Sequence, residues 1–327
     1  MSATVGVLAG MVLLISGGAL LVRGASEVAA RMGVSQLIVG LTVVGFGTSA
    51  PELVVNVVGA LRGVTDIAFG NVVGSNISNL ALVLGAAALM RPIAIHGQLV
   101  LREVPLLMLA TAAIMVMALD EPLEGLPAII GRSEAIILLL LFCIFIYINT
   151  LDLVKTRRAD ALVEDIEHNP LIATRPEGPF RWLFVAAGMG LLFVGGEMTV
   201  RNGVALAESL GISAAIVGLF VIAVGTSMPE LVTSIIAAVR KESDLALGNV
   251  VGSNIFNSLI VLPASGLISQ IPVPRGGQID LVVSLSLTLF LIPVFIFGEA
   301  RMGRKTGGFL LLVYFAYVAA RIVYDAA

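Results

Sequence analysis

Gly47-Thr48-Ser49-Ala50-Pro51-Glu52 decides how this chain folds, because it places a proline and a carboxylate inside the segment 36–61, which is otherwise apolar enough to cross a bilayer. Nearly the same six residues return as Gly225-Thr226-Ser227-Met228-Pro229-Glu230, 178 positions later. An ionisable group at bilayer depth is costly and is therefore a sign of function. The chain carries two copies of one intramembrane site.

The composition places the whole chain in a membrane. Of its 327 residues, 58% are hydrophobic and only 13% are charged, which leaves too little polar surface to cover a soluble core of this size. The net charge of -3 gives no reason to expect nucleic acid, and no obligatory protein partner is evident. We expect an all-α integral membrane protein whose surroundings are the lipid bilayer.

Ten segments are long and apolar enough to be transmembrane helices. They cover about 4–22, 36–61, 67–89, 99–119, 133–151, 181–200, 213–239, 245–267, 278–298 and 307–324. One long polar connection, Asp152 to Pro179, separates the fifth segment from the sixth and contains three prolines. It predicts a linker between two halves.

The basic residues predict the orientation. With ten spans, the loops after the first, third, fifth, seventh and ninth share one side, and that side receives 14 of the 19 Lys and Arg residues. Short cytoplasmic loops collect Lys and Arg, so this side is predicted to be cytoplasmic. The linker would then be cytoplasmic, and both termini would lie outside.

The repeat is larger than its signature. Ile38 to Leu84 matches Ile216 to Leu262 without a gap, with identity at more than half of the positions. We predict a first five-helix repeat over 1–151, a linker over 152–180 and a second repeat over 181–327. Because each half has an odd number of spans, the second half enters from the opposite face, which gives the inverted-repeat plan of many secondary transporters with a binding site at the midplane.

Each six-residue stretch should break its helix. Pro51 and Pro229 lack a backbone donor and crowd the carbonyl four residues earlier, and glycines loosen the same turn. Non-helical backbone at this depth is tolerated only where protein or water covers it. Carbonyl, hydroxyl and carboxylate oxygens would then line a cavity, which suits Ca²⁺ or Na⁺ and suits softer metals poorly.

A second motif follows each break. Gly70-Asn71-Val72-Val73-Gly74-Ser75-Asn76-Ile77-Ser78-Asn79 returns as Gly248-Asn249-Val250-Val251-Gly252-Ser253-Asn254-Ile255-Phe256-Asn257. On a helix Asn71, Ser75 and Asn79 form one polar stripe. The two glycines permit close approach of a neighbouring helix. We expect the broken helices to supply partners for this stripe.

The charges at the site predict a transport mechanism. No Lys or Arg precedes either glutamate within its span, so a bound cation is the natural counter-charge for Glu52 and Glu230. Two carboxylates balance one Ca²⁺, two Na⁺ or two protons. A site that stays neutral while it reorients exchanges one set for another, which predicts an antiporter with Glu52 and Glu230 facing each other, and neither an enzyme nor a cofactor-dependent protein.

The doubled motifs resemble the two alpha-repeats of the cation/calcium exchanger superfamily, and most closely its prokaryotic sodium/calcium exchangers. The resemblance covers nearly the whole chain and implies a prokaryotic inner (plasma) membrane protein, with the first and sixth helices sliding beside a rigid core. It implies that Ca²⁺ is held by Glu52 and Glu230 with oxygens of Thr48 and Thr226. It further implies sodium ligands and central residues as follows: Ser49, Ser75, Ser227, Ser253, the carbonyls of Gly45 and Ala223, and Asn79 with Asn257.

Residues near the two glutamates also bear on the identity of the coupling ion. Some relatives, including the potassium-dependent branch, have an aspartate where this chain has Asn257, so an amide there argues against potassium co-transport. The proton-coupled branch usually has a second acid after Gly-Asn, which is missing in both copies here. Exchange of H⁺ for Ca²⁺ remains the alternative. A passive cation channel and an intramembrane hydrolase with a carboxyl dyad are rival classes.

Overall fold

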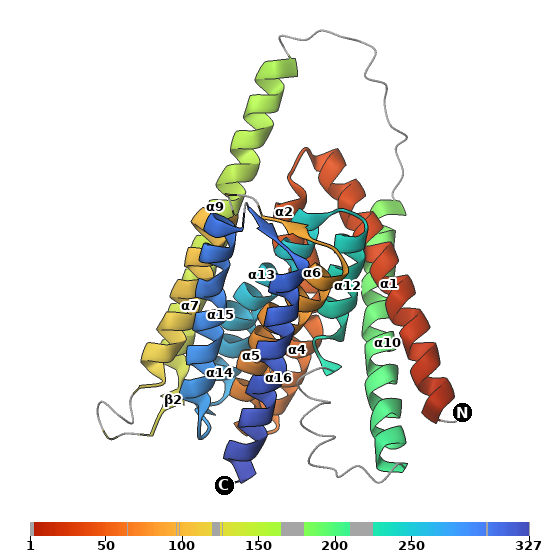
Figure 1. Cartoon of the computed structure of the whole chain (residues 1–327). Coiled ribbons are helices and arrows are strands. Elements are labelled where there is room, and N and C mark those ends of the chain that lie inside the picture. The colour runs from red at the N-terminus through yellow and green to blue at the C-terminus, as the bar shows by residue number, and fades with distance from the viewer. Residues whose placement is uncertain are drawn as a thin grey trace.

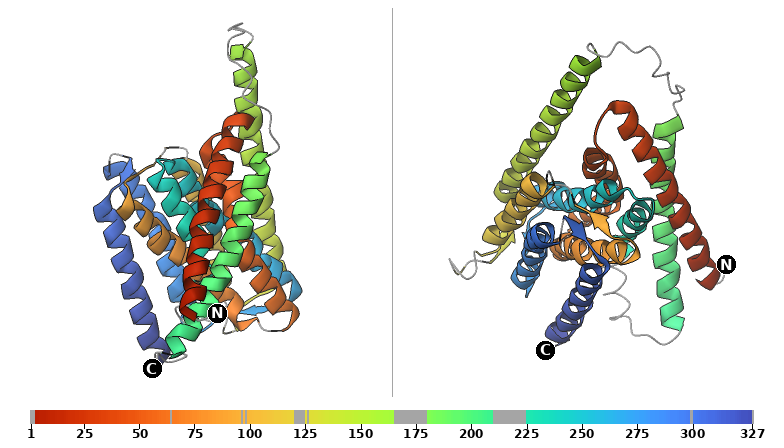
Figure 2. Two further views of the ribbon diagram at one scale, coloured as in Figure 1. Left: turned by 90° about the vertical axis from the view of Figure 1, so that its right-hand side faces the viewer. Right: turned by 45° about the horizontal axis from the view of Figure 1, so that its top comes forward.

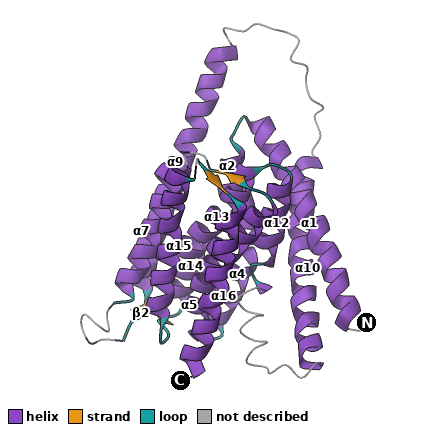
Figure 3. Ribbon diagram, in the orientation of Figure 1, coloured by secondary structure: helices purple, strands orange, loops and turns teal. Residues whose placement is uncertain are grey.

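The computed structural model describes residues 3–63, 65–95, 97, 99–119, 125, 127–164, 180–209, 225–298 and 300–326. Within these residues the protein is almost entirely helical, with four very short strands (Figure 3). The helical class predicted from composition is confirmed.

Eight helices in the described residues are long and apolar enough to span a bilayer. Six are α1 (Ala3–Met32), α7 (Val104–Met117) with the π-helical stretch η3 (Leu99–Glu103) before it, α9 (Arg132–Glu164), α10 (Phe180–Ser209), α15 (Gly277–Phe297) and α16 (Arg304–Ala326). The other two are composite: α5 (Asp66–Ile77), η2 (Ser78–Val83) and α6 (Leu84–Met90), and α13 (Ser243–Phe256), η4 (Asn257–Val261) and α14 (Leu262–Ile268).

A ninth span is broken. It consists of α2 (Gln36–Val39), the π-helical η1 (Gly40–Val44) and α3 (Gly45–Thr48), followed after a bend of 43° by α4 (Ala50–Leu61). These nine spans coincide with nine of the predicted segments. Of the predicted span 213–239 the structure describes α12 (Met228–Val239), and 213–224 lies outside the described residues, so a total of ten stays a prediction.

The first part of the predicted linker, 152–164, is helical. α9 continues as helix to Glu164, beyond the predicted end of its span at 151, and projects from the rest of the molecule (Figure 1). Residues 165–179 lie outside the described part. α1 begins and α16 ends towards the opposite end of the molecule (Figures 1 and 2). The membrane face to which that end belongs stays a prediction.

α1 and α10 run side by side at one edge of the molecule (Figures 1 and 2). Their glycines allow the backbones to touch: a Cβ on Gly17 would lie 2.8 Å from the carbonyl oxygen of Gly188, and one on Gly195 would lie 2.8 Å from that of Gly10. Small residues at such an interface are the usual device for close packing of membrane helices.

The interior of the molecule is formed by the two helices that carry the asparagine motif. Every residue of α13 from Leu245 to Phe256 is buried. Two short antiparallel strand pairs join segments that are distant in the chain: β1 (Ile93–Ala94) with β4 (Arg301–Met302), and β2 (Ile129–Ile130) with β3 (Ile271–Pro272). Each pair links a strand from 1–151 to one from 181–327, so the two sequence halves are joined on both sides of the core.

Candidate functional site

The two copies of the six-residue stretch, called here the first elbow (47–52) and the second elbow (225–230), have the same backbone geometry. Ser49 has φ -86° and ψ 5°, and Ser227 has φ -84° and ψ 8°, so neither serine is helical, and α4 and α12 begin directly after them. Pro51 and Pro229 follow in the first turn of α4 and α12, where a missing N–H costs little. The predicted break before Glu52 is confirmed, whereas before Glu230 the structure shows that α12 begins at Met228, and residues 213–224 of that predicted span lie outside the described part.

The threonine of each elbow reaches the asparagine motif of the other sequence half. Thr48 donates to the Oδ1 of Asn249 at 3.0 Å and lies 3.2 Å from the Oγ of Ser253, both on α13. Thr226 lies 3.4 Å from the Oγ of Ser75 on α5. The elbows therefore supply the partners that the polar stripes require.

Gly45 shows why the first of these contacts depends on glycine. A Cβ there would lie 2.9 Å from the backbone nitrogen of Ser253, closer than real Cβ atoms come. The close approach brings the Gly45 carbonyl within 3.2 Å of the Ser253 hydroxyl, which donates to it. The predicted sodium ligands Gly45 and Ser253 are thus brought together, whereas Ala223, the repeat mate of Gly45, lies outside the described residues.

Both elbow carboxylates are completely buried: Glu52 and Glu230 are each 0% exposed. Ser49 donates to one oxygen of Glu230 at 3.2 Å. Within the described part of the chain, both oxygens of Glu52, the other oxygen of Glu230 and the hydroxyl of Ser227 have no hydrogen-bond partner of normal geometry. Buried oxygens left in this way are expensive unless something binds them.

The central asparagines form two crossed pairs between the motif helices. Asn79 donates to Asn254 at 2.9 Å, and Asn257 donates to Asn76 at 3.2 Å. The Oδ1 atoms of Asn79 and Asn257 have no partner among the described residues, so both amide oxygens remain for a ligand. Asn76 and Asn254 were not among the predicted site residues. Their identity at matching positions of both motifs was the signal that could have found them.

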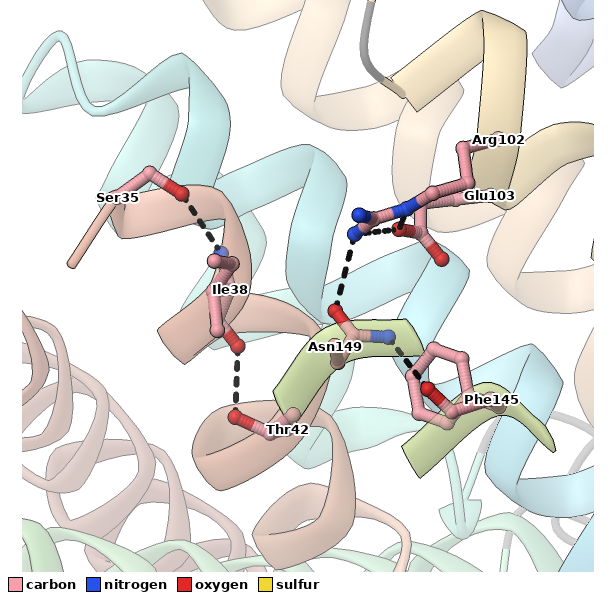
Figure 4. Close-up of polar contacts among 7 residues, drawn as sticks. All are labelled: Ser35, Ile38, Thr42, Arg102, Glu103, Phe145 and Asn149. Carbon is pink, nitrogen blue, oxygen red and sulfur yellow. Dashed lines mark hydrogen bonds and ion pairs between the residues drawn. The ribbon is translucent and has the colours of Figure 1, made fainter. Parts of the chain in front are cut away.

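Two other buried acids provide a contrast. Glu103 accepts from the Nε of its neighbour Arg102 at 2.6 Å, and Arg102 also donates to Asn149 on α9 at 3.1 Å (Figure 4). Asp280 lies 3.2 Å from the Nε of Arg321 and accepts from the Tyr317 hydroxyl at 2.8 Å. Each of these acids has a permanent cationic neighbour.

Glu52 and Glu230 have no such neighbour. No ion pair joins either one to a Lys or Arg in the part of the chain that the structure describes. Their surroundings consist of hydroxyl, amide and carbonyl oxygens, which are ligands for hard cations. A bound Na⁺ or Ca²⁺ would satisfy the unpaired oxygens and the excess negative charge together.

The sequence profile of the family described as "Sodium/calcium exchanger protein" matches residues 2–151 and 180–323. The chain is 36% identical over 321 residues to the putative antiporter CaxA of Alkalimonas amylolytica, with 96% of both chains covered. It is 33% identical over 339 residues to the inner membrane protein YrbG of Escherichia coli, with 99% of both covered.

Two further relatives carry a functional name. The sodium/calcium exchanger MaX1 of Methanosarcina acetivorans is 30% identical over 336 residues, covering 95% of this chain and 96% of that protein. The solved structure of the sodium-calcium exchanger NCX_Mj, soaked with zero Na⁺ and Ca²⁺, superposes with a TM-score of 0.79 at 27% identity and covers 97% of this chain and 98% of that one. The helical arrangement described above is therefore that of an exchanger.

Proposed function

This chain belongs to the sodium/calcium exchanger family, a family of membrane transporters and not of enzymes, and we propose that it exchanges Na⁺ for Ca²⁺ at Glu52 and Glu230. The observation that carries the proposal is the pair of fully buried carboxylates that lack any basic partner in the described residues. Cation/Ca²⁺ exchange as such follows from the family. The coupling ion and the site are our proposal.

Charge balance explains why exchange would be obligatory. With one Ca²⁺ or two Na⁺ bound, the two carboxylates are neutralised, whereas the empty site keeps two negative charges at bilayer depth. Reorientation of the site through the bilayer centre would therefore be slow when it is empty and fast when it is loaded. A transporter with this property couples the two ion fluxes by alternating access.

We further propose the architecture of ten helices in two inverted repeats, 1–151 and 181–327, joined by a cytoplasmic linker over 152–180. The crossed contacts support it, because Thr48 reaches α13 of the other half while Thr226 reaches α5. A site built equally from both halves changes its access when one part of the molecule moves against the other. α1 and α10 at the edge are the moving pair in this proposal.

The ligand roles that we propose are those that the family resemblance implies. Glu52, Glu230, Thr48 and Thr226 would hold Ca²⁺. The Na⁺ ligands would be Ser49, Ser75, Ser227, Ser253 and the carbonyls of Gly45 and Ala223, with Asn79 and Asn257 lining the central position. Unpartnered oxygens of Asn79, Asn257 and Ser227 support this set. We place the protein in the inner membrane of its cell, as the name of its relative YrbG states for that protein.

The test is transport by the purified protein in sealed vesicles. A Na⁺ gradient without a pH gradient should drive uptake of ⁴⁵Ca²⁺, and a pH gradient without Na⁺ should not. Uptake driven by the pH gradient alone would replace our proposal with H⁺/Ca²⁺ exchange. Calcium flux in the absence of any opposing ion would indicate a channel.

A further inference from the structure

A cavity of about 390 Å³ lies between α10, the first turns of α4 and α12, and α5. Its walls are mainly apolar and include Val54, Phe193 and Pro229. Three polar residues also line it: Glu197 on α10, Asn71 on α5 and Thr226 of the second elbow. The cavity therefore connects a carboxylate outside the proposed site to a hydroxyl that belongs to it.

Glu197 is the unexplained residue. It lies within the membrane-spanning part of α10, Trp182–Gly203, and its side chain is exposed. It has no ion pair in the described part of the chain, and Arg201, one turn further along, does not pair with it. An acid at membrane depth is tolerated where it faces a water-filled cavity or a cation, and it then marks an ion pathway.

Asn71 provides an independent observation in the same cavity. It is 4% exposed, and its Nδ2 donates to Asn56 at 2.7 Å, but its buried Oδ1 has no partner in the part of the chain that the structure describes. The repeat mate Asn249 has the same donor contact, to Ser234 at 2.9 Å, yet its Oδ1 accepts from Thr48. Of these two repeat mates, only Asn71, which lines the cavity, has an amide oxygen without a partner among the described residues.

The two sliding helices differ at matching positions. On α1, a Cβ on Gly18 would lie 2.8 Å from the Ile236 side chain, so α1 is packed directly against α12. On α10, a Cβ on the mate Gly196 would meet no described atom within 4 Å. The residue after Gly18 is Ala19, and the residue after Gly196 is Glu197. At these matching positions, only α10 has both space beside its glycine and an acidic residue next to that glycine.

We propose that Glu197, with the Oδ1 of Asn71 and the hydroxyl of Thr226, forms a recruiting position for hydrated Na⁺ and Ca²⁺ between one membrane face and the two-glutamate site. The face is the one at which α10 ends, which is the outer face in the proposed orientation. The inference rests on the proposed function. A carboxylate at the low-dielectric mouth of a cavity concentrates cations and raises their rate of entry.

Transport measured from each face tests the role of this carboxylate. We expect Glu197→Gln to raise the KM for external Ca²⁺ about tenfold, most strongly at low ionic strength. The KM for cytoplasmic Ca²⁺ and the maximal rate should stay unchanged. Glu27→Gln, which removes a partly exposed acid paired with Arg23, is the matched control and should leave both KM values unchanged. An equal change from both faces, or no change, would overturn the proposal.

Chemical labelling gives a readout independent of transport. In a Cys143→Ser background, which removes the one native thiol, Glu197→Cys should react with a membrane-impermeant cationic thiol reagent added outside. Saturating Ca²⁺ should slow the reaction, and the same reagent inside should not react. Labelling from the cytoplasmic face only, or no labelling in a folded variant that still binds Ca²⁺, would contradict the assignment.

Equilibrium binding separates this inference from the proposed function. Glu52→Gln should abolish ⁴⁵Ca²⁺ binding to the detergent-solubilised protein, whereas Glu197→Gln should leave the equilibrium affinity of the central site nearly unchanged. If Glu52→Gln still binds Ca²⁺, the proposed function fails. If it does not, and Glu197→Gln transports normally from outside, the recruiting position alone is wrong.

Discussion

The four buried acids of the described residues fall into two pairs that differ in how their charge is balanced. Glu103 and Asp280 each contact an arginine. Glu52 and Glu230 are at least as well buried, and neither forms an ion pair with a Lys or Arg among the described residues. Among the described residues an arginine balances Glu103 and Asp280, whereas in our proposal the elbow carboxylates are neutralised by the transported ions.

The largest expected effect comes from removing an elbow charge. Glu52→Gln and Glu230→Gln should each abolish sodium-driven ⁴⁵Ca²⁺ uptake, because one carboxylate no longer balances a divalent ion. Asp280→Asn is the matched control, since it neutralises an acid that already has an arginine partner, and it should retain exchange. Full exchange in both elbow variants would remove the distinction between the two pairs.

The converse change removes the arginine that neutralises a buried structural acid. Arg102→Gln leaves the buried Glu103 without its cation and should lower the free energy of unfolding by about 3–5 kcal/mol. The double variant Arg102→Gln, Glu103→Gln should recover most of that loss, as thermal unfolding in detergent would reveal. If the single variant is as stable as the parent protein, Glu103 is not held by Arg102 in the way described.

A smaller effect distinguishes the two elbows. In ion-free buffer Ser49→Ala removes the donor to Glu230 and should destabilise the protein by about 1.5–3 kcal/mol, the range for hydrogen bonds to charged groups. Ser227→Ala removes a hydroxyl that has no partner in the described residues and should have little effect. If chemical unfolding shows that both variants lower the free energy of unfolding equally, the two elbows are equivalent in the ion-free protein.

Much of this site was predictable because its two motifs occur in both sequence repeats. Matching the copies located both glutamates, the helix breaks and the motif helices, and the periodicity of the motif indicated its polar stripe. The contacts of Asn76 and Asn254 were not predicted, because spacing on one helix does not say which neighbour faces it. The arginine partners of Glu103 and Asp280 were missed for the same reason.

The extent of α9 could not be predicted from hydropathy. Asp152–Glu164 is charged, which marks the exit from the membrane, and the same residues are good helix formers, so the helix continues outside. Polarity indicates where a span leaves the bilayer and says little about where the helix ends. The residues from 165 to 179 and from 210 to 224 lie outside the described part and leave those predictions as they were.

Ion density in crystals soaked alternately in Ca²⁺ and in Na⁺ tests the central claim most directly. We predict one Ca²⁺ peak bounded by the carboxylates of Glu52 and Glu230, replaced by weaker peaks near the elbow and motif hydroxyls in Na⁺, with no ion at Glu103 or Asp280. Soaks in which neither ion occupies the space between Glu52 and Glu230 would contradict the account.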